Sequence, residues 1–419
     1  MLAIRPRTSP VDARVEVPGS KSMTNRALVV ASLAETGVSR LYRPLEADDT
    51  AVMRSALRSY GVLIDDNDDP WLVLGTGGDL AEPEAVVDVG ASGTTARFVT
   101  AIAGLVPGLS KIDGIPRMRE RPIGALLDAL GAMGVDASGA EGFPPVEVRG
   151  TGRLTGGRVT VDASVSSQFA SAILMVAPMA DERVEIELQG PVVSRSYLEG
   201  TVEMMRVFGA EVTVDGDRFV VEPTGYRKAH VAIEPDASAA VYPAVAAAIT
   251  GGHVVIPGVP PQSVQPDLAI LDVLAAMGCR VARTDAGVEV TGPEGGRLAP
   301  VDVDLTNAPD GSMAVAVAAM FADGETRIRG LSTLRVKETD RLAALETEIR
   351  RLGSEADVVD DSLVIRPRPL HGAEIQTYGD HRMAMSLALV GLRVEGVSVS
   401  DPTVVNKTWP EYFRMLEQL

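Results

Sequence analysis

The chain has 419 residues, of which 46% are hydrophobic and 23% charged, and its formal net charge at pH 7 is −18. This composition is typical of a globular protein of two or three domains, and the excess of carboxylates argues against a nucleic-acid-binding surface. The single cysteine, Cys279, excludes an intrachain disulfide and a thiolate metal cluster, and four histidines are few for a metal site. The first residues lack an apolar signal core and no apolar run approaches the roughly 18 residues of a membrane span, so we expect a cytoplasmic protein.

A turn followed by a helix start lies at residues 17–28, which read VPGSKSMTNRAL. On a helix Ser22 and Arg26 share one face. Together with Lys21 and free backbone N–H groups they would form a site for a phosphate or a carboxylate. The glycine spacing does not match a Walker A loop, so a nucleotide is not implied. The alternative is a capped surface helix with solvated cations, and further motifs are needed to decide.

One pattern recurs five times along the chain: an amphipathic helix, a glycine, an alternating strand, a short polar turn and a second strand. A glycine at that place ends a helix at low conformational cost, and the alternation predicts antiparallel hairpins with one buried face. The spacings between the glycines are 73, 75, 69 and 75 residues, too long for a solenoid repeat. The helix-ending glycines are Gly61, Gly134, Gly209, Gly278 and Gly353.

The two ends of the chain can supply a sixth module, because the N-terminal LAIRP reads as a strand that could join the strand in VEGVSVSDPTVV near the C-terminus. Six modules make two lobes of three. The first lobe is then discontinuous, with residues 1–15 plus 235–419, and the second lobe comprises residues 16–234.

Several motifs between the repeats place hydroxyl or cationic side chains at expected helix starts. In the first half, VGASGTTARFV contains Arg97, RMRERPI packs three arginines ahead of a helix expected to begin at Pro122, and SVSSQF and SRSYLEG supply serines. In the second half, Asp310 precedes an apolar helix, and GDHRMAM and NKTW place further cations at helix starts. RVKETDRL is expected to open a helix on which Lys337 and Arg341 share a face and Glu338 lies within one turn of Arg341. Each motif alone could be a helix cap or a solvated face.

Taken together, cations and serines at helix starts recur through both halves of an acidic chain, with Asp310 and Glu338 among them as possible proton carriers. No Ser-His-Asp order, dinucleotide fingerprint or metal-ligand set is present. The residues therefore favour a two-lobed enzyme that clamps small polyanions between its lobes and closes on them.

PGSKSMTNRAL, RMRERPI, SVSSQF, RVKETDRL and GDHRMAM, in this order, resemble the enolpyruvyl transferase family, and the likeness covers essentially the whole chain. It is closest to the branch that acts on shikimate 3-phosphate. The resemblance implies an α/β fold of two lobes, each of three βαβαββ-type units, with the active site in the cleft between them. It implies transfer of the enolpyruvyl (carboxyvinyl) group of phosphoenolpyruvate to the 5-hydroxyl of shikimate 3-phosphate, with release of phosphate.

That reaction belongs to chorismate and aromatic amino-acid biosynthesis and passes through a tetrahedral intermediate. The resemblance further implies no cofactor and no metal, a monomer without nucleic-acid or membrane partners, and competitive inhibition by glyphosate against phosphoenolpyruvate.

The resemblance also assigns residues. Asp310 looks like the group that binds and deprotonates the 5-hydroxyl, and Glu338, helped by Lys21, would move protons at C3 of phosphoenolpyruvate. The implied shikimate 3-phosphate ligands are Lys21, Ser22, Arg26, Ser166, Ser167, Gln168, Ser194, Tyr197, Asp310 and Lys337. The implied phosphoenolpyruvate ligands are Lys21, Gly93, Arg121, Gln168, Arg341, Arg382 and Lys407. The chain departs from the family at Ala91 and Thr333, where asparagine is frequent.

Two alternatives stay open. The branch of the family that acts on UDP-N-acetylglucosamine shares the fold and the chemistry, but it usually carries a reactive cysteine in the lobe that here precedes residue 235, and Cys279 lies outside that lobe. A non-catalytic anion-binding protein on the same fold is the second alternative. The presence of Lys21, Asp310, Glu338 and Arg382 argues against it.

Overall fold

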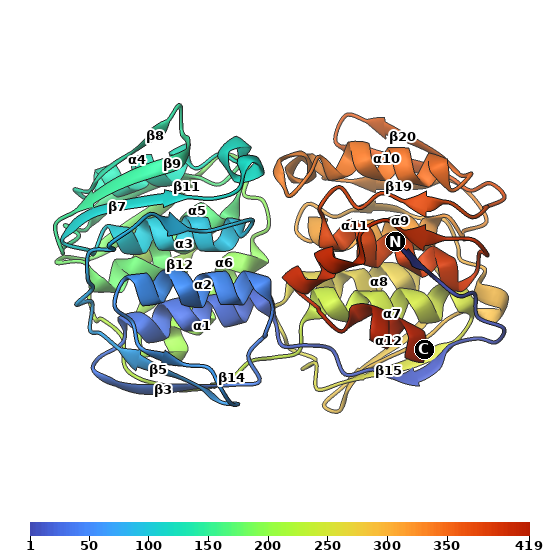
Figure 1. Ribbon diagram of the computed structural model, residues 1–419, viewed down its shortest axis with the longest axis horizontal. Coiled ribbons are helices and arrows are strands. Elements are labelled where there is room, and N and C mark those ends of the chain that lie inside the picture. The colour runs from blue at the N-terminus through green and yellow to red at the C-terminus, as the bar shows by residue number, and fades with distance from the viewer. The chain divides into compact units, whose positions relative to one another are not determined.

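The structure is a computed structural model that describes residues 1–419. Contacts between residues divide the chain into two compact units, each with its own hydrophobic core. Unit 1 comprises Met1–Pro18 and Glu234–Leu419, and unit 2 comprises Gly19–Ile233. None of the helices is long and apolar enough to cross a membrane. Each unit contains three small sheets, so the six expected modules are present (Figure 1).

Unit 2 contains six α-helices and sheets of order β14-β3-β5-β4, β6-β7-β9-β8 and β10-β11-β13-β12. Its helices are α1 (Lys21–Leu33), α2 (Asp48–Ser59), α3 (Gly93–Ala103), η1 (Pro116–Glu120), α4 (Gly124–Ala132), α5 (Ser167–Val176), η2 (Ala177–Met179) and α6 (Ser196–Val207). Its strands are β3 (Gly37–Tyr42), β4 (Ile64–Asp65), β5 (Trp71–Gly75), β6 (Val87–Asp88), β7 (Gly108–Asp113), β8 (Asp136–Ala140), β9 (Phe143–Gly150), β10 (Gly157–Asp162), β11 (Val184–Gln189), β12 (Val212–Asp215), β13 (Arg218–Val221) and β14 (His230–Ala232).

Unit 1 contains sheets of order β1-β23-β22, β16-β17-β15-β2 and β18-β19-β21-β20. Its helices are α7 (Ala237–Thr250), η3 (Pro266–Leu268), α8 (Ala269–Ala276), η4 (Glu294–Gly296), η5 (Pro309–Gly311), α9 (Ser312–Ala319), η6 (Ser332–Val336), α10 (Arg341–Arg351), α11 (His381–Ala388), η7 (Leu389–Leu392), η8 (Pro402–Lys407) and α12 (Tyr412–Gln418). Its strands are β1 (Leu2–Ala3), β2 (Asp12–Arg14), β15 (His253–Pro257), β16 (Arg280–Thr284), β17 (Gly287–Thr291), β18 (Asp302–Asp304), β19 (Thr326–Arg329), β20 (Glu355–Val359), β21 (Ser362–Arg366), β22 (Glu374–Ile375) and β23 (Ser398–Val399).

The five predicted helix–glycine–hairpin repeats are confirmed. Each predicted glycine follows a helix with its φ in the left-handed region, at 86°, 82°, 85°, 103° and 100° in chain order. Each is followed by an antiparallel hairpin: β4–β5, β8–β9, β12–β13, β16–β17 and β20–β21. The repeat is visible in sequence because a left-handed helix end strongly favours glycine, whichever side chains surround it.

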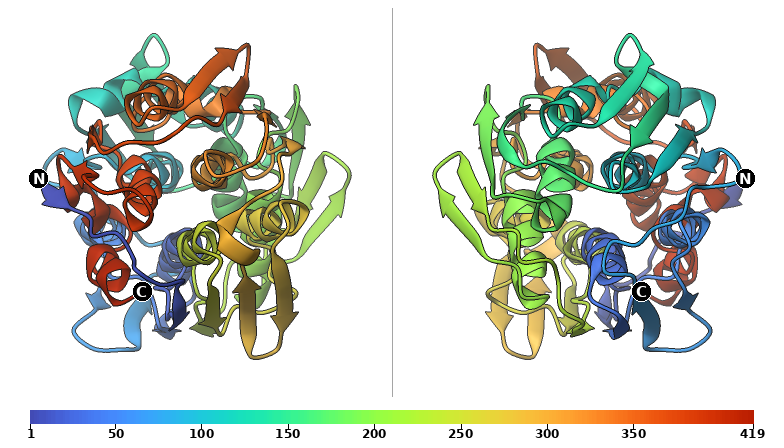
Figure 2. Two further views of the ribbon diagram at one scale, coloured as in Figure 1. Left: turned by 90° about the vertical axis from the view of Figure 1, so that its right-hand side faces the viewer. Right: turned by 90° about the vertical axis from the view of Figure 1, so that its left-hand side faces the viewer.

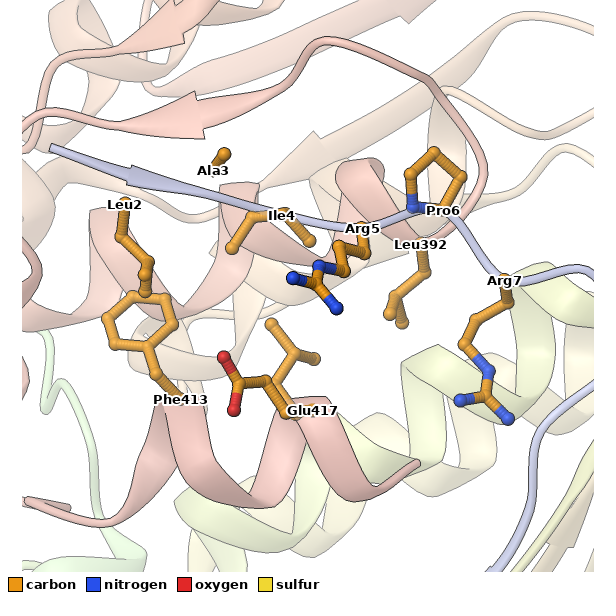
Figure 3. A pocket seen from close by; sticks show the side chains of 10 residues that line it. Leu2, Ala3, Ile4, Arg5, Pro6, Arg7, Leu392, Phe413 and Glu417 are labelled. Atoms are coloured by element: carbon orange, nitrogen blue, oxygen red, sulfur yellow. The ribbon is translucent and has the colours of Figure 1, made fainter.

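The sixth module joins the two ends of the chain, as predicted. Leu2 of β1 lies opposite Val399 of β23 in an antiparallel pair, and β22 continues the sheet in parallel. Figure 3 shows the N-terminal segment passing over η7 and α12, and a hollow of about 490 Å³ remains between them. Its walls are Leu2–Arg7, Leu392, Phe413, Leu416 and Glu417.

Two strands explain why unit 1 is assembled from separate parts of the chain. Strand β2 precedes α1 in sequence but pairs in parallel with β15, which follows α7. Strand β14 precedes α7 but pairs in parallel with β3, which follows α1. The first modules of the two units have therefore exchanged their first strands, and the chain passes from one unit to the other at each exchange.

Three helices in each unit are buried on nearly every face. They are α1, α3 and α5 in unit 2 and α7, α9 and α11 in unit 1. The left-hand view of Figure 2 shows the sheets of unit 1 at its outside and helices between them. The buried helices are rich in alanine and valine, which suits close helix packing in a protein with few aromatic residues. The motifs predicted from the sequence to bind anions lie at the N-termini of α1, α3, α5, α9 and α11 or on elements beside these helices.

Candidate active site

The start of α1 holds a buried cation in place. Ser20 caps the helix, and Nη1 of Arg26 donates to Oγ of Ser22 at 2.6 Å, which confirms that these two residues share a face. Nε of Arg26 donates to Oγ1 of Thr201 at 2.7 Å, and Nη2 donates to the carbonyl of Tyr197 at 3.2 Å and to Oγ of Ser171 at 3.3 Å.

All of these partners of Arg26 are neutral. Burial lowers the pKa of Arg26 to about 10, with a small opposing contribution from Tyr197, so the guanidinium is still charged at neutral pH. A buried cation without a carboxylate partner attracts an anion strongly, because little water competes for it.

Lys21 differs from Arg26, because its Nζ lies 3.1 Å from Oδ2 of Asp49. Asp49 stands in the first turn of α2 and is 3% exposed. Asp49 was not predicted as a site residue, since an aspartate in the first turn of a helix is usual there. The ion pair fixes the position of the Lys21 ammonium group beside the start of α1.

The serines of the SVSSQF motif open α5, as expected. Ser166 is the N-cap and accepts from the backbone N–H of Gln168, and Ser167 is buried beside it. The amide Nε2 of Gln168 donates to Oγ1 of Thr94 at 3.2 Å, which joins the starts of α5 and α3. Ser194 is also buried and has a left-handed φ of 56°, a strained conformation for a residue with a side chain.

The arginines of RMRERPI do not act as one group. Arg117 and Arg119 are paired with Glu120 and Asp113, and Arg119 is well exposed. Only Arg121 is buried, at 7% exposure, and its Nε has no hydrogen-bond partner. The helix predicted to start at Pro122 starts at Gly124 instead, after the η1 turn.

Arg121 packs directly on Gly93 at the start of α3. A methyl group built on Gly93 would lie 2.5–2.7 Å from Nη2, Cζ and Nη1 of Arg121. Arg97 supports the neighbouring backbone, because its Nη2 donates to the carbonyl of Pro122 at 2.7 Å and its Nη1 to the carbonyl of Gly93 at 3.2 Å. The missing side chain at Gly93 thus makes room for the Arg121 guanidinium.

In unit 1 the centre of the site is Arg341, which is 1% exposed. Its Nε and Nη2 donate to the two carboxylate oxygens of Asp380 at 2.7 and 3.2 Å. Nη1 donates to Asp310 at 2.8 Å and Nη2 to Glu338 at 2.9 Å. Burial opposes the charge on Arg341, but these three carboxylates together raise its pKa above the usual value.

The sequence interpretation of this segment was wrong in one respect. Lys337 and Glu338 were expected on the same helix as Arg341, but α10 begins at Arg341, with Asp340 as its N-cap. Glu338 reaches Arg341 from the preceding loop, and Asp380, the N-cap of α11, was not predicted to have a role in the site. An aspartate before an apolar helix is an ordinary cap in sequence, and only the packing of α10 against α11 reveals the second role.

Asp310 lies among three cations. Nη1 of Arg341 is 2.8 Å away, and Nζ of Lys337 and Nη2 of Arg382 are each 3.6 Å away. Burial alone would raise the pKa of Asp310, but Lys337, Arg382 and Arg341 outweigh burial and hold it well below its usual range. Lys407 extends the cluster, with its Nζ 3.8 Å from Glu338. The carboxylates predicted to carry protons are therefore in one ion network.

The loop before Asp380 is held by a buried carboxylate, Glu348 of α10. Glu348 accepts from the backbone N–H of Gln376 at 3.1 Å, from the hydroxyl of Tyr378 at 2.8 Å and from Nε of Arg351. Tyr378 and Gly379 both have left-handed φ angles, 54° and 66°. Glu348 thus stabilises the left-handed backbone at Tyr378 and Gly379, and this backbone places Asp380 within hydrogen-bond distance of Arg341.

The chain is similar to known proteins over nearly its whole length. It matches the family EPSP synthase (3-phosphoshikimate 1-carboxyvinyltransferase) over residues 6–416. The 3-phosphoshikimate 1-carboxyvinyltransferase of Nostoc punctiforme is 43% identical over 421 residues, covering 98% of this chain and 97% of the relative. The protein of the same name from Thiobacillus denitrificans is 43% identical over 423 residues, covering 99% and 98%. A solved EPSP synthase from Acinetobacter baumannii superposes with a TM-score of 0.82 at 24% identity, covering 100% of this chain and 97% of that one.

Proposed function

The chain belongs to the EPSP synthase family, the 3-phosphoshikimate 1-carboxyvinyltransferases, and on this basis we propose which of its residues bind the substrates and carry the reaction. It is a transferase that moves the carboxyvinyl group of phosphoenolpyruvate to the 5-hydroxyl of shikimate 3-phosphate and releases phosphate. The reaction is a step of the shikimate pathway toward chorismate and the aromatic amino acids. The family match over nearly the full length is the observation that carries this assignment.

We propose that shikimate 3-phosphate binds to unit 2 through the starts of α1, α5 and α6. The buried charge of Arg26, which has only neutral partners, supports this assignment. The serines Ser166, Ser167 and Ser194, together with Ser22 and Lys21, would hold the 3-phosphate, while Gln168 and Tyr197 flank the ring. Serine hydroxyls and backbone N–H groups at a helix start bind phosphate oxygens well.

For phosphoenolpyruvate we propose Arg121 with Gly93, Lys21 and Gln168 from unit 2, and Arg341, Arg382 and Lys407 from unit 1. Arg121 is buried and has no carboxylate partner, so an anion would compensate its charge.

Arg341 has one N–H left after its contacts with Asp310, Glu338 and Asp380. Its main contribution is then to hold these carboxylates, and Arg382 carries more of the binding.

The charges around Asp310 suggest how it becomes a base. In the substrate-free protein its low pKa makes it a weak proton acceptor. Phosphoenolpyruvate bound to Arg382 would draw this cation away from Asp310, which raises the pKa of Asp310. Asp310, also in contact with Lys337, would then accept the proton of the 5-hydroxyl as that oxygen attacks C2 of phosphoenolpyruvate. Glu338 and Lys21 would protonate C3 and later remove a C3 proton as phosphate leaves.

The direct test is phosphate release from phosphoenolpyruvate, measured in parallel with shikimate 3-phosphate and with UDP-N-acetylglucosamine as acceptor. Release with shikimate 3-phosphate alone is the expected result. Release with the nucleotide sugar alone would assign the chain to the other branch of the fold, and release with neither would favour an anion-binding protein without catalysis.

We also propose that the protein works as a cytoplasmic monomer and closes on its substrates. Light scattering after size exclusion should give a mass near the 44.0 kDa of one chain. Saturation with shikimate 3-phosphate should reduce the radius of gyration in small-angle scattering. An unchanged radius would count against closure without affecting the assignment of the reaction.

A further inference from the structure

Asp267 is a buried carboxylate beside the site to which neither the sequence motifs nor the mechanism assigns a role. It lies in the η3 turn and is 1% exposed. Oδ2 accepts a hydrogen bond from the hydroxyl of Ser238 in the first turn of α7. Oδ1 is buried and has no hydrogen-bond partner. It lies close to the residue after Asp310, because a methyl group built on Gly311 would be 3.2 Å from it.

Ser238 connects Asp267 to Arg382. Nη2 of Arg382 donates to Oγ of Ser238 at 3.2 Å, and the same nitrogen lies 3.6 Å from Oδ2 of Asp310. A hydroxyl group has only one hydrogen to donate. Because Ser238 gives this hydrogen to Asp267, its oxygen lone pairs are left to accept from Arg382. The carboxylate therefore determines which way the hydroxyl faces.

We propose that Asp267 is a positioning residue, which acts through Ser238 to orient the Arg382 guanidinium for an anionic substrate. The proposal rests on the assignment of Arg382 to phosphoenolpyruvate made above. Charge-assisted hydrogen bonds of this kind fix the plane of a guanidinium, and a planar group binds carboxylate or phosphate well only in the correct orientation.

The electrostatics of the site agree with this role. Burial raises the pKa of Asp267 to about 6, and the charges of Asp310 and Asp236 act in the same direction. Arg382 and the hydrogen bond from Ser238 oppose the rise. Tyr242 of α7 also faces this group, and burial raises its pKa to about 12, so it stays neutral. Asp267 is thus mainly ionised above about pH 6 and mainly neutral below it.

The first experiment compares Asp267→Asn and Ser238→Ala with the unaltered enzyme at pH 8. Each should raise KM for phosphoenolpyruvate by about tenfold, the effect of losing one hydrogen bond to a charged group. KM for shikimate 3-phosphate should stay within about twofold. The double variant should be no worse than either single variant, because the two residues act as one unit. The matched control is Asp272→Asn, since Asp272 is 74% exposed and pairs only with Arg283 at the surface.

The second experiment uses pH, because asparagine imitates the neutral form of Asp267. The ratio of KM for phosphoenolpyruvate in Asp267→Asn to that in the unaltered enzyme should be about ten at pH 8 and approach one near pH 5. The ratio is needed because the phosphate of the substrate itself titrates near pH 6. A ratio that is already near one at pH 8, where Asp267 is ionised, would overturn the proposal.

Two other outcomes are distinguishable. If Asp267 merely repels the substrate as a nearby negative charge, Asp267→Asn would lower KM and Ser238→Ala would leave it unchanged, which refutes positioning. Arg382→Lys tests the assignment on which the proposal rests. If this variant leaves KM for phosphoenolpyruvate unchanged, Arg382 does not bind phosphoenolpyruvate, and the proposed function of Arg382 is refuted rather than the positioning role of Asp267. Thermal melting identifies a variant that does not fold, and Ser238→Ala, which keeps the carboxylate, then carries the test.

Discussion

The guanidinium of Arg121 occupies the space that a side chain at residue 93 would need. A methyl group on Gly93 would stand 2.5 Å from Nη2 of Arg121, closer than such contacts occur in proteins. The guanidinium is the far end of a flexible side chain, so it can shift more easily than the backbone at the start of α3, and an added methyl group would push it out of its buried position.

We therefore expect Gly93→Ala to displace Arg121 and to raise KM for phosphoenolpyruvate by about tenfold or more, the cost of a misplaced charge-assisted contact. KM for shikimate 3-phosphate should change little. Gly131→Ala is the matched control, because Gly131 lies in α4 of the same unit with nothing within 4 Å of the added methyl group. Equal KM values for the two variants would contradict the role of Arg121.

Asp310→Ala should reduce kcat by about 100-fold or more, since it removes the proposed proton acceptor. The protein should keep its fold, as judged by circular dichroism. Asp302→Ala on β18 is a suitable control, because Asp302 is 61% exposed and pairs only with Arg329. Turnover equal to that of the unaltered enzyme would refute the role of Asp310.

Arg341→Met should lower the free energy of unfolding by about 3–5 kcal/mol, because it leaves the buried Asp380 and the half-buried Asp310 and Glu338 without their shared cation. Urea denaturation measures this loss. Arg350→Met is the control on the same helix. The Arg350 side chain is 52% exposed, so its ion pairs contribute at most about 1 kcal/mol to the free energy of unfolding. Similar losses for both variants would show that the buried network does not stabilise the fold.

Cys279 should be inert toward thiol reagents in the folded protein. Burial raises the pKa of its thiol to about 12, so the reactive thiolate is scarce at neutral pH. Iodoacetamide should leave activity unchanged and label Cys279 only after denaturation, and Cys279→Ala should retain full turnover. Loss of activity on alkylation of the native protein would instead support the alternative assignment to the branch of the family that uses a reactive cysteine.

Glyphosate should inhibit the enzyme competitively with phosphoenolpyruvate, because its phosphonate and carboxylate could engage the same arginines. Initial rates at several concentrations of both compounds should give lines that intersect at a common maximal velocity. Undiminished turnover with inhibitor far in excess of phosphoenolpyruvate would show that the site differs from this expectation.

The sequence by itself determined the modular fold and the starts of the site helices. Helix-ending glycines such as Gly61 and Gly353, the alternating hairpins behind them and the capping serines of α5 depend on local backbone geometry, which neighbouring residues specify. The motif at Ser22 and Arg26 could be read for the same reason, since a helix brings residues four apart onto one face.

Only the tertiary structure decided which charges meet. It buried Arg121 and left Arg119 exposed, although both come from one motif. It also paired Asp380 with Arg341 and Asp267 with Ser238 across long stretches of chain. A lone aspartate has an ordinary local role as a cap or turn residue, so its sequence neighbours cannot show the second role. That role arises from the packing of separate modules, which sets both the distance between charges and the loss of water around them.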